Sequence, residues 1–116
     1  MVELKKTQKD GVTVLRFSGN LTQEEVERIE PQFVAAIDQP SPKIVVDLSK
    51  VSAMTTPGIS MFVAALKSTA KAGGRIVFTG TRGIVDELLH RCRLDAIMTI
   101  VPKPDDAIEM ARGPKA

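Results

Sequence analysis

The sequence predicts a single α/β domain with a mixed β-sheet and helices packed on it. Two short apolar runs, Ile44–Val46 and Ile76–Phe78, are rich in β-branched residues, which is typical of strands buried on both faces. The segment between them repeats apolar residues at helical spacing. Extended over the chain, this alternation predicts the order ββαβαβαβα, with right-handed crossovers wherever strands run parallel.

The N-terminal segment is expected to form a hairpin. Residues 2–6 are predicted as an edge strand, and residues 12–17 as the next strand. Asp10-Gly11 between them is predicted as the turn, because this pair tolerates positive φ. Gly19-Asn20 closes the second strand.

The first helix is expected to begin at Thr22, a favourable N-cap, with Glu24 and Glu25 in the first turn where the helix dipole favours anions. Its apolar stripe consists of Val26, Ile29, Phe33 and Ile37. Pro31 lies within that stripe and removes a backbone hydrogen bond, so a kink or an early break is expected there.

The central segment is the most informative part of the chain. Asp47 is expected to end the buried strand, and a short loop follows. Thr55-Thr56-Pro57-Gly58 then opens a helix, with Thr56 as its N-cap and Pro57 at the first helical position. The apolar face of this helix is Ile59, Phe62, Val63, Leu66 and Ala70. Gly73-Gly74 ends it.

After the second buried strand, a turn with Thr81 as its cap leads into a third helix. The apolar face of that helix is expected to be Ile84, Val85, Leu88 and Leu89. Cys92 is predicted to be a small core residue. A short strand near Ile100 and a last helix capped by Asp105-Asp106 complete the chain.

Composition narrows the classes of function. At 116 residues the chain is long enough for one domain, predicted to span residues 1–116. A formal net charge of +2 and the lack of Trp and Tyr argue against nucleic acid as a partner. A single His makes a histidine metal site improbable, and one Cys excludes an internal disulfide. No apolar run approaches the roughly 20 residues that span a membrane, and no export signal is visible, so the cytoplasm is expected without direct membrane insertion.

The central segment resembles the STAS domain, the module of sulfate transporters and anti-sigma factor antagonists. Members of this family show an apolar strand, Asp-Leu, an apolar linker and Asp-Ser-Ser-Gly before a helix. Here Asp47-Leu48 matches the first marker, and Val51 and Met54 match the linker. The resemblance extends over nearly the whole chain, and it implies a single STAS-like domain.

The match is weakest at the turn that the family phosphorylates. Thr55 stands where the family has Asp, and Thr56 stands at the phosphorylated Ser or Thr. Pro57 replaces the second Ser, whereas Gly58 is kept. Arg93 occupies a position near the end of the third helix where the family usually has Gly, so a different helix end is expected.

The resemblance implies an anti-sigma factor antagonist, a non-catalytic switch that binds an anti-sigma factor serine/threonine kinase. Phosphorylation would release this partner and a phosphatase would restore binding. The implied acceptor is Thr56, with Thr55 as a second candidate, and Gly58, Ile59 and Met61 are expected near the contact surface. ATP and magnesium would belong to the kinase, and the chain itself is expected to need no cofactor.

Other interpretations remain open from the residues. The Thr55–Gly58 turn is also explained as a plain helix cap. The altered motif adds weight to a second option, a STAS docking subunit of a lipid-transport ATPase or of a stress-signalling scaffold. A small-ligand or nucleotide sensor would use the loop Gly80–Gly83, although this loop is more simply a turn. An enzyme is disfavoured, because no nucleophile-base pair, metal cluster or phosphate-binding loop stands out. Asp47 is the best candidate for a functional acid, but a loop cap explains it more simply.

Overall fold

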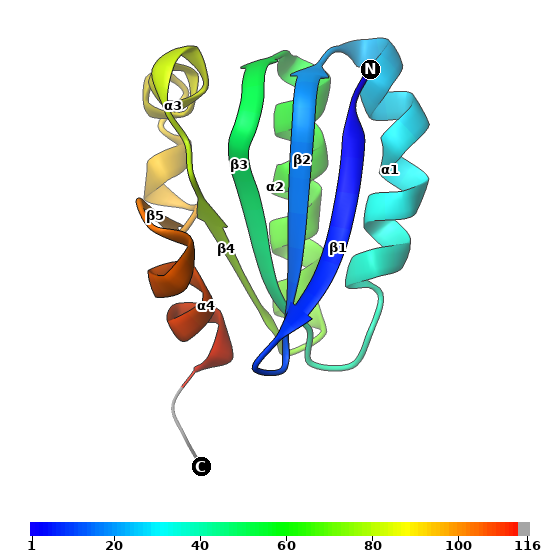
Figure 1. The fold of residues 1–116 in the computed structure, drawn as a ribbon, viewed down its shortest axis with the longest axis vertical. Coiled ribbons are helices and arrows are strands. Elements are labelled where there is room, and N and C mark those ends of the chain that lie inside the picture. Colours follow the sequence, from blue (N-terminus) through cyan, green and yellow to red (C-terminus); the bar gives the residue numbers. More distant parts are fainter. Residues whose placement is uncertain (114–116) are drawn as a thin grey trace.

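The computed structural model describes residues 1–113, and its elements follow the predicted order (Figure 1). They are β1 (Glu3–Lys9), β2 (Val12–Leu21), α1 (Gln23–Ile37), β3 (Lys43–Met54), α2 (Thr56–Lys71), β4 (Arg75–Thr79), α3 (Gly83–Arg91), a 3₁₀ turn (Leu94–Ala96), β5 (Ile100–Val101) and α4 (Pro104–Arg112). The predicted alternation of strands and helices is therefore confirmed.

The five strands form one sheet in the order β1-β2-β3-β4-β5. The first pair is antiparallel and the other three pairs are parallel, so the sheet is mixed, as predicted. Asp10 and Gly11 both adopt positive φ in the β1–β2 turn, which confirms the expected hairpin. The strand around Ile44 is central, and the strand around Ile76 lies beside it.

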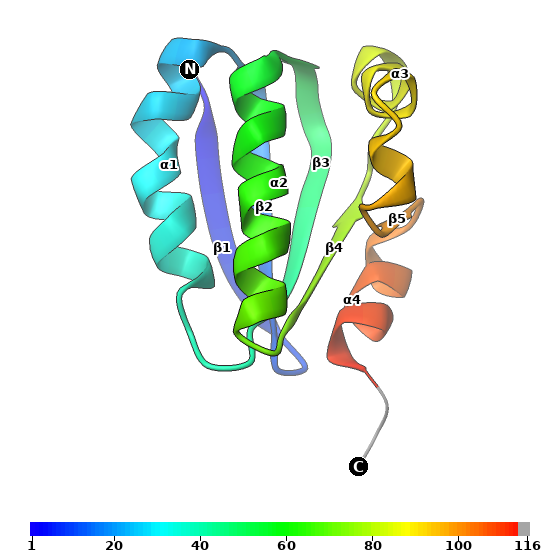
Figure 2. The ribbon, with the colours of Figure 1, turned by 180° about the vertical axis from the view of Figure 1, so that it is seen from behind.

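The helices divide between the two faces of the sheet. Helices α1 and α2 cover one face, as Figure 2 shows, while α4 packs against β3 and β4 on the other (Figure 1). The core beneath α1 and α2 contains all four phenylalanines, with ring centroids 5.4 to 5.7 Å apart in edge-to-face pairs. These are Phe17, Phe33, Phe62 and Phe78. Such pairs add to the free energy that burial of the rings already provides.

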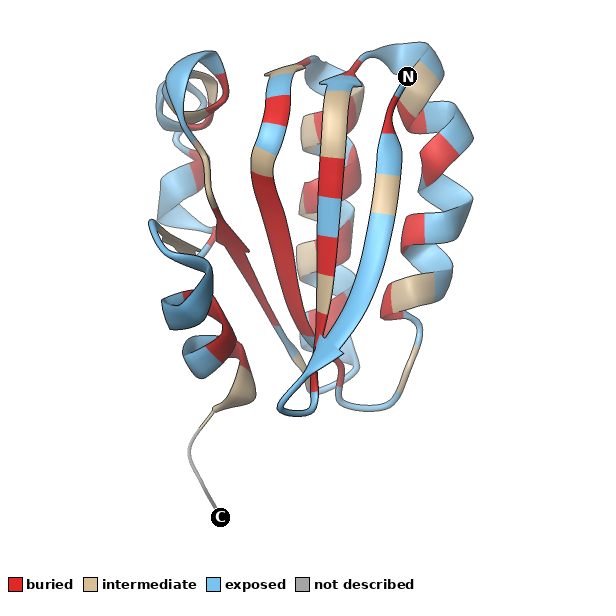
Figure 3. Cartoon of the chain, viewed as in Figure 1, coloured by how far each residue is buried: buried red, intermediate tan, exposed pale blue. Residues whose placement is uncertain are grey.

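A smaller apolar cluster lies between the sheet and α4. It consists of Val12, Val45, Val77, Ala107, Ile108 and Ala111. The lower half of β3 is consequently buried on both faces (Figure 3), which explains its continuous apolar run. On the sheet face that α4 packs against, the upper half lies beyond this helix and carries polar side chains.

Two predicted breaks do not occur. The expectation that the strand ends at Asp47 is wrong, because β3 continues to Met54 by pairing with β2 across bulges. Helix α1 also passes through Pro31 without interruption. Glu27, whose carbonyl Pro31 cannot bond, is exposed to water, so the lost hydrogen bond is not buried.

The buried face of the third helix differs from the predicted one. Only Val85 and Leu89 of α3 are buried, whereas Ile84 is 67% exposed. Cys92 is exposed, so its assignment to the core is wrong. It caps a helix of only nine residues, and Arg93 then adopts the left-handed conformation at φ 56°. The chain then returns to the core at Leu94, so the different helix end that was expected at Arg93 is present.

Candidate functional site

The turn between β3 and α2 lies at the upper edge of the sheet in Figure 1, where the parallel strands β2 and β3 end. Helices α1 and α2 both begin at this edge. The carboxyl ends of parallel strands are the usual place for functional sites in α/β folds, because the loops that leave them converge. The turn holds both threonines that the sequence singled out.

Thr55 is the N-cap of α2, and the prediction that Thr56 caps the helix is wrong. Thr55 has an extended backbone, and its carbonyl accepts the N–H groups of Gly58 and Ile59 at 3.0 and 3.2 Å. Its side chain does not cap the helix. Instead, both its hydroxyl and its N–H donate to the carbonyl of Leu21, at 2.9 and 3.1 Å. These two hydrogen bonds therefore fasten the start of α2 to the end of β2, that is, they hold the first turn of the helix against the strand.

Thr56 is the first residue of α2, and Pro57 follows at the second helical position. Thr56 is exposed, and of the two threonines only Thr55 has a hydroxyl hydrogen bond within the described residues. A helix N-terminus carries a partial positive charge, which favours an anionic group at such a position. Pro57 lacks the N–H that an ordinary residue would offer to that group.

Gly58 is buried beneath the same turn. A Cβ at this position would lie 2.8 Å from Cγ of Met54 and 3.4 Å from Cβ of Leu21. The glycine therefore allows the start of α2 to approach the ends of β2 and β3. It supports the turn from below and offers no side chain to a partner.

The other two predicted contact residues differ in exposure. Ile59 is half-buried and follows Gly58 on the first turn. Met61 is 3% exposed and belongs to the main core, where it lines a cavity of about 110 Å³ between α1 and α2. The structure thus brings Thr56 and Ile59 to the surface near the turn, and it places Met61 inside.

Asp47 is buried within β3 on the face opposite α2. Its Oδ2 accepts a hydrogen bond from Nε of Arg16 at 3.2 Å, and its Oδ1 accepts the N–H of Ser49 at 2.9 Å. The carboxylate is therefore paired with a cation and satisfies a backbone donor next to the bulge. The prediction that Asp47 caps a loop is wrong, because Asp47 and Ser49 both lie within β3.

The loop Gly80–Gly83 leaves β4 and opens α3. The N-cap is Arg82, so the prediction that Thr81 caps this helix is wrong. Thr81 instead donates its hydroxyl to Oδ1 of Asp86 at 2.8 Å, and Arg82 donates to the carbonyl of Ser49 at 2.9 Å. Both polar side chains of this loop are engaged within the domain.

Glu25 and His90 have shifted pKa values. The N–H of Val2, 3.0 Å away, lowers the pKa of Glu25, and Arg28 at 2.7 Å lowers it further. The carbonyl of Asp86, which accepts from Nδ1 of His90 at 2.8 Å, raises the pKa of His90. The nearby Asp86 carboxylate adds to that upward shift. Glu25 holds the N-terminus against α1, and His90 lies near the end of α3.

Within residues 1–113 no group of three or more His, Cys, Asp or Glu side chains is placed to hold a metal ion. Over the same residues, none of the helices combines the length and the apolar character needed to cross a bilayer.

Sequence reasoning missed the interactions that join distant segments in the upper part of the sheet. The hydrogen bonds of Thr55 to Leu21, of Arg16 to Asp47 and of Arg82 to Ser49 span more than 30 positions in the chain. One signal was present, because Arg16 and Asp47 each interrupt an apolar strand pattern with opposite charges. The other two contacts use backbone carbonyls, which leave no trace in the side-chain sequence.

Comparison with known proteins agrees with this architecture. Among solved structures, an anti-sigma factor antagonist from Mycobacterium paratuberculosis is 25% identical, with a TM-score of 0.87 over 97% of this chain and 96% of that chain. A STAS domain protein from Planctomyces limnophilus, also an anti-sigma factor antagonist, is 22% identical, with a TM-score of 0.85 over 96% and 98%. The Bacillus cell fate determinant SpoIIAA in its phosphorylated form is 18% identical, with a TM-score of 0.69 over 93% and 98%.

A search of curated proteins gave no match. The family model for the STAS domain, however, matches residues 3–107, which include every strand and the first three helices. The chain therefore belongs to the STAS domain family, and it is similar in structure to the anti-sigma factor antagonists of that family.

Proposed function

We propose that this protein is an anti-sigma factor antagonist that works as a phosphorylation-controlled binding switch. In its unmodified form it would sequester an anti-sigma factor serine/threonine kinase. The observation that carries the proposal is the exposed Thr56 at the first position of α2, on a turn that is fastened to β2. Similarity to antagonists from two bacteria supports the general role.

The geometry of the turn suits a reversible modification of Thr56. Its hydroxyl is accessible to a kinase, whereas that of Thr55 is bound to the carbonyl of Leu21. A phosphate would add roughly −1.5 to −2 charges at pH 7. Because the helix N-terminus favours an anion, the fold should tolerate this charge. Thr56 is therefore the primary acceptor in the proposal, and Thr55 is the secondary one.

The proposed contact surface is centred on Thr56 and Ile59. Gly58 contributes by keeping the helix close to the strands, and Met61 contributes only by supporting the first turns from the core. A phosphate at the centre of this surface would be desolvated when the partner binds. Desolvating an unpaired charge is unfavourable, so modification would release the partner.

The proposed role is not catalytic. ATP and magnesium would be bound by the kinase, and a phosphatase would regenerate the binding form. The phosphorylated state of the Bacillus relative supports such a cycle for this fold. This role would place the protein in the cytoplasm.

The test begins with capture of the partner from the native cell extract, followed by mass spectrometry for phosphate on the recovered protein. Affinities for the purified partner are then compared by calorimetry. We expect Thr56→Glu to bind about tenfold more weakly or worse, a loss of about 1.4 kcal/mol. We expect Thr56→Ala to bind like the parent and to resist control by the kinase.

The matched control is Ser68→Glu, which adds the same charge to an exposed position near the other end of α2. It should bind the partner as the parent does. If Thr56→Glu also binds like the parent, and neither threonine carries phosphate, the switch is excluded.

A second candidate function is a docking subunit of a larger assembly, such as a lipid-transport ATPase or a stress-signalling scaffold. Thr55, which replaces the acidic residue of the family motif, is used here to fasten α2 to β2. This use favours a turn that is permanently structural. Capture of a transporter or scaffold subunit, with binding unaffected by Thr56→Glu, would support this function in place of the switch.

A further inference from the structure

The C-terminal strand leaves part of its neighbour uncovered. β4 extends from Arg75 to Thr79, but β5 contains only two residues and pairs only with Phe78 and Thr79. Among residues 1–113, no strand pairs with residues 75–77 on this side of β4, although the side chains of Ile76 and Val77 are themselves buried. This strand edge is far from the turn that contains Thr56. An uncovered strand edge presents unpaired backbone groups to any chain that can lie alongside it.

The direction of these backbone groups follows from their neighbours. The N–H of Arg75 donates to the carbonyl of Pro42 at 2.7 Å, on the β3 side. The N–H of Phe78 donates to the carbonyl of Thr99 at 2.8 Å, on the β5 side. Because successive residues of a strand direct their N–H and C=O to alternate sides, those of Ile76 must point to the β5 side. There β5 has not yet begun, so the Ile76 backbone faces an open edge.

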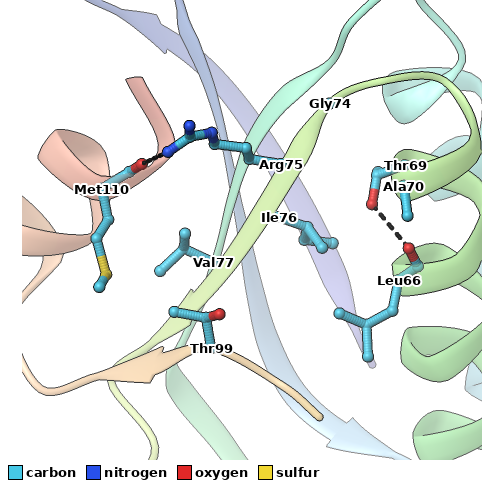
Figure 4. Close-up of a pocket in the computed structure, with 9 residues that line it drawn as sticks. All are labelled: Leu66, Thr69, Ala70, Gly74, Arg75, Ile76, Val77, Thr99 and Met110. Carbon is cyan, nitrogen blue, oxygen red and sulfur yellow. Dashed lines mark hydrogen bonds between the residues drawn. The ribbon is translucent and has the colours of Figure 1, made fainter. Parts of the chain in front are cut away.

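A cavity of about 320 Å³ adjoins this edge between α2 and α4 (Figure 4). Leu66 and Ala70 of α2 form one wall, and Met110 of α4 lies on the opposite side. Figure 4 also shows the side chains of Ile76 and Val77 pointing to opposite sides of β4. A strand laid along β4 would alternate in the same way, with every second side chain directed towards α2.

The lower end of the cavity is cationic. Arg75 is exposed, and its Nη1 donates to the carbonyl of Met110 at 3.3 Å (Figure 4). Among residues 1–113 no carboxylate forms an ion pair with Arg75, nor with Lys67 or Lys71 near the end of α2. Within the described part of the chain, the edge thus combines a backbone donor and acceptor that no strand uses, an apolar wall and a positive charge without a carboxylate partner.

We propose that this edge binds an extended acidic and apolar segment of a partner protein, which adds to the sheet in line with β5. One side chain of the segment contacts Leu66 and Ala70, and the next, an Asp or Glu, pairs with Arg75. Backbone hydrogen bonds to Ile76 fix its register. This mode of recognition adds a strand to a sheet, so the backbone contributes affinity and alternate side chains contribute specificity.

The charge distribution argues against a second copy of this chain as the occupant. The edge strand at the opposite side of the sheet is β1, and it carries Lys5, Lys6 and Lys9. Pairing β1 of one copy with β4 of another would bring these lysines towards Arg75. Lysines on an exposed edge are a common protection against such pairing. Over residues 75–77 the β4 edge carries one cation, Arg75, and no lysine.

The probe for this site is a short capped peptide of alternating valine and aspartate, added to the ¹⁵N-labelled protein. We expect the amide resonances of Ile76, Val77 and Thr99 to shift, while those of Thr55 and Thr56 stay in place. The same peptide with lysine in place of aspartate should bind more weakly. N-methylation of the central valine, which removes a backbone donor, should also weaken binding.

Charge reversal on the protein tests the role of Arg75. Arg75→Glu should weaken binding of the aspartate peptide about fivefold or more, because an attraction becomes a repulsion. Lys5→Glu, on the opposite edge, is the matched control and should leave the affinity unchanged. Both positions are exposed, so both variants should fold.

Three results would overturn the proposal. The first is the absence of shifts at Ile76 and its neighbours with millimolar aspartate peptide. The second is equal affinity for the aspartate and lysine peptides. The third is a concentration-dependent dimer that Arg75→Glu abolishes, which would assign the edge to a second copy.

Discussion

Two turns that connect a strand to the following helix differ in how their polar side chains are engaged. The turn after β3 follows Met54 at the upper edge of the sheet, whereas the turn after β4 lies lower, beside Ser49 of β3. The turn after β4 binds both polar side chains internally, Thr81 to Asp86 and Arg82 to Ser49. The turn after β3 binds only Thr55 internally and leaves Thr56 exposed. We call the turn after β4, residues 80–83, the closed turn, and the turn after β3, residues 55–58, the open turn.

This difference has a structural cause in the backbone that each turn approaches. Gly80 adopts φ 78°, and a Cβ there would lie 2.8 Å from the backbone nitrogen of Ser49. The β4 turn is therefore pressed against β3. Gly58, by contrast, meets the flexible side chain of Met54, so the β3 turn rests on a surface that can adjust.

The largest expected effect concerns the sheet that carries both turns. Val46→Asp should unfold the domain, because an uncompensated buried charge lowers the free energy of unfolding by about 3–5 kcal/mol. Val46 is fully buried in the main core, whereas its neighbour Asp47 is buried beside Arg16. Circular dichroism and thermal melting measure the effect. The exposed Thr7→Asp is the control, and a parent-like melt of Val46→Asp would refute the assignment of the core strand.

The second prediction compares the two glycines. Gly80→Ala should lower the free energy of unfolding by about 2–4 kcal/mol, since it adds left-handed strain and a contact with backbone. Gly58→Ala should change it by no more than about 1 kcal/mol, because the helical preference of Ala offsets the displacement of Met54. Urea denaturation of both variants gives the ranking. A larger loss for Gly58→Ala would mean that the open turn is the more tightly packed of the two.

The sequence predicts those parts of the fold that depend on neighbouring residues. The apolar runs of β3 and β4, the stripe of α1 and the Asp10-Gly11 hairpin were all predictable, because burial and backbone preference act within a few neighbouring residues. The continuation of β3 past Asp47 was not, since it depends on pairing with residues 18–21 of β2. The position of Met61 in the core likewise depends on the approach of α1.

The candidate site was predictable only in part. The sequence placed threonines at the start of α2, but it assigned the cap to Thr56 because Pro often follows a cap directly. Instead, Thr55 is the N-cap, and its hydroxyl and its N–H both donate to the carbonyl of Leu21. A backbone acceptor contributed by a distant strand cannot be inferred from the residues of the turn.

The third prediction separates the two threonines of the open turn. Thr55→Val should lower the free energy of unfolding by about 1 kcal/mol, because the hydrogen bond to Leu21 is lost. Thr56→Val should change it by less than about 0.5 kcal/mol, as expected for an exposed position. Hydrogen exchange of the first-turn amides of α2 should accelerate only in Thr55→Val. Thr55→Ser, which keeps the hydroxyl, serves as control, and equal exchange in all three variants would contradict the fastening role.

The smallest expected effect belongs to the closed turn and depends on pH. Asp86 joins this turn to His90, since its carboxylate accepts from Thr81 and its carbonyl accepts from Nδ1 of His90. The hydrogen bond to the Asp86 carbonyl, together with the charges of Asp86 and Asp95, raises the pKa of His90. A pKa raised on folding stabilises the folded state fully below the unfolded pKa, and this stabilisation disappears as the pH rises through the folded pKa.

Because the chain contains one His, a proton NMR titration reports this group without ambiguity. We expect a pKa above the ordinary histidine value, and a slight fall in the melting temperature of the parent relative to His90→Gln as the pH rises through that pKa. Asp86→Asn should lower the pKa of His90, whereas Glu87→Gln, which removes the partner of Arg91, should not. Thr56→Glu should leave the titration unchanged, because the open turn is separate from this network. A shift of the His90 titration in Thr56→Glu would instead show that the two turns are coupled, so the difference between them would no longer be local.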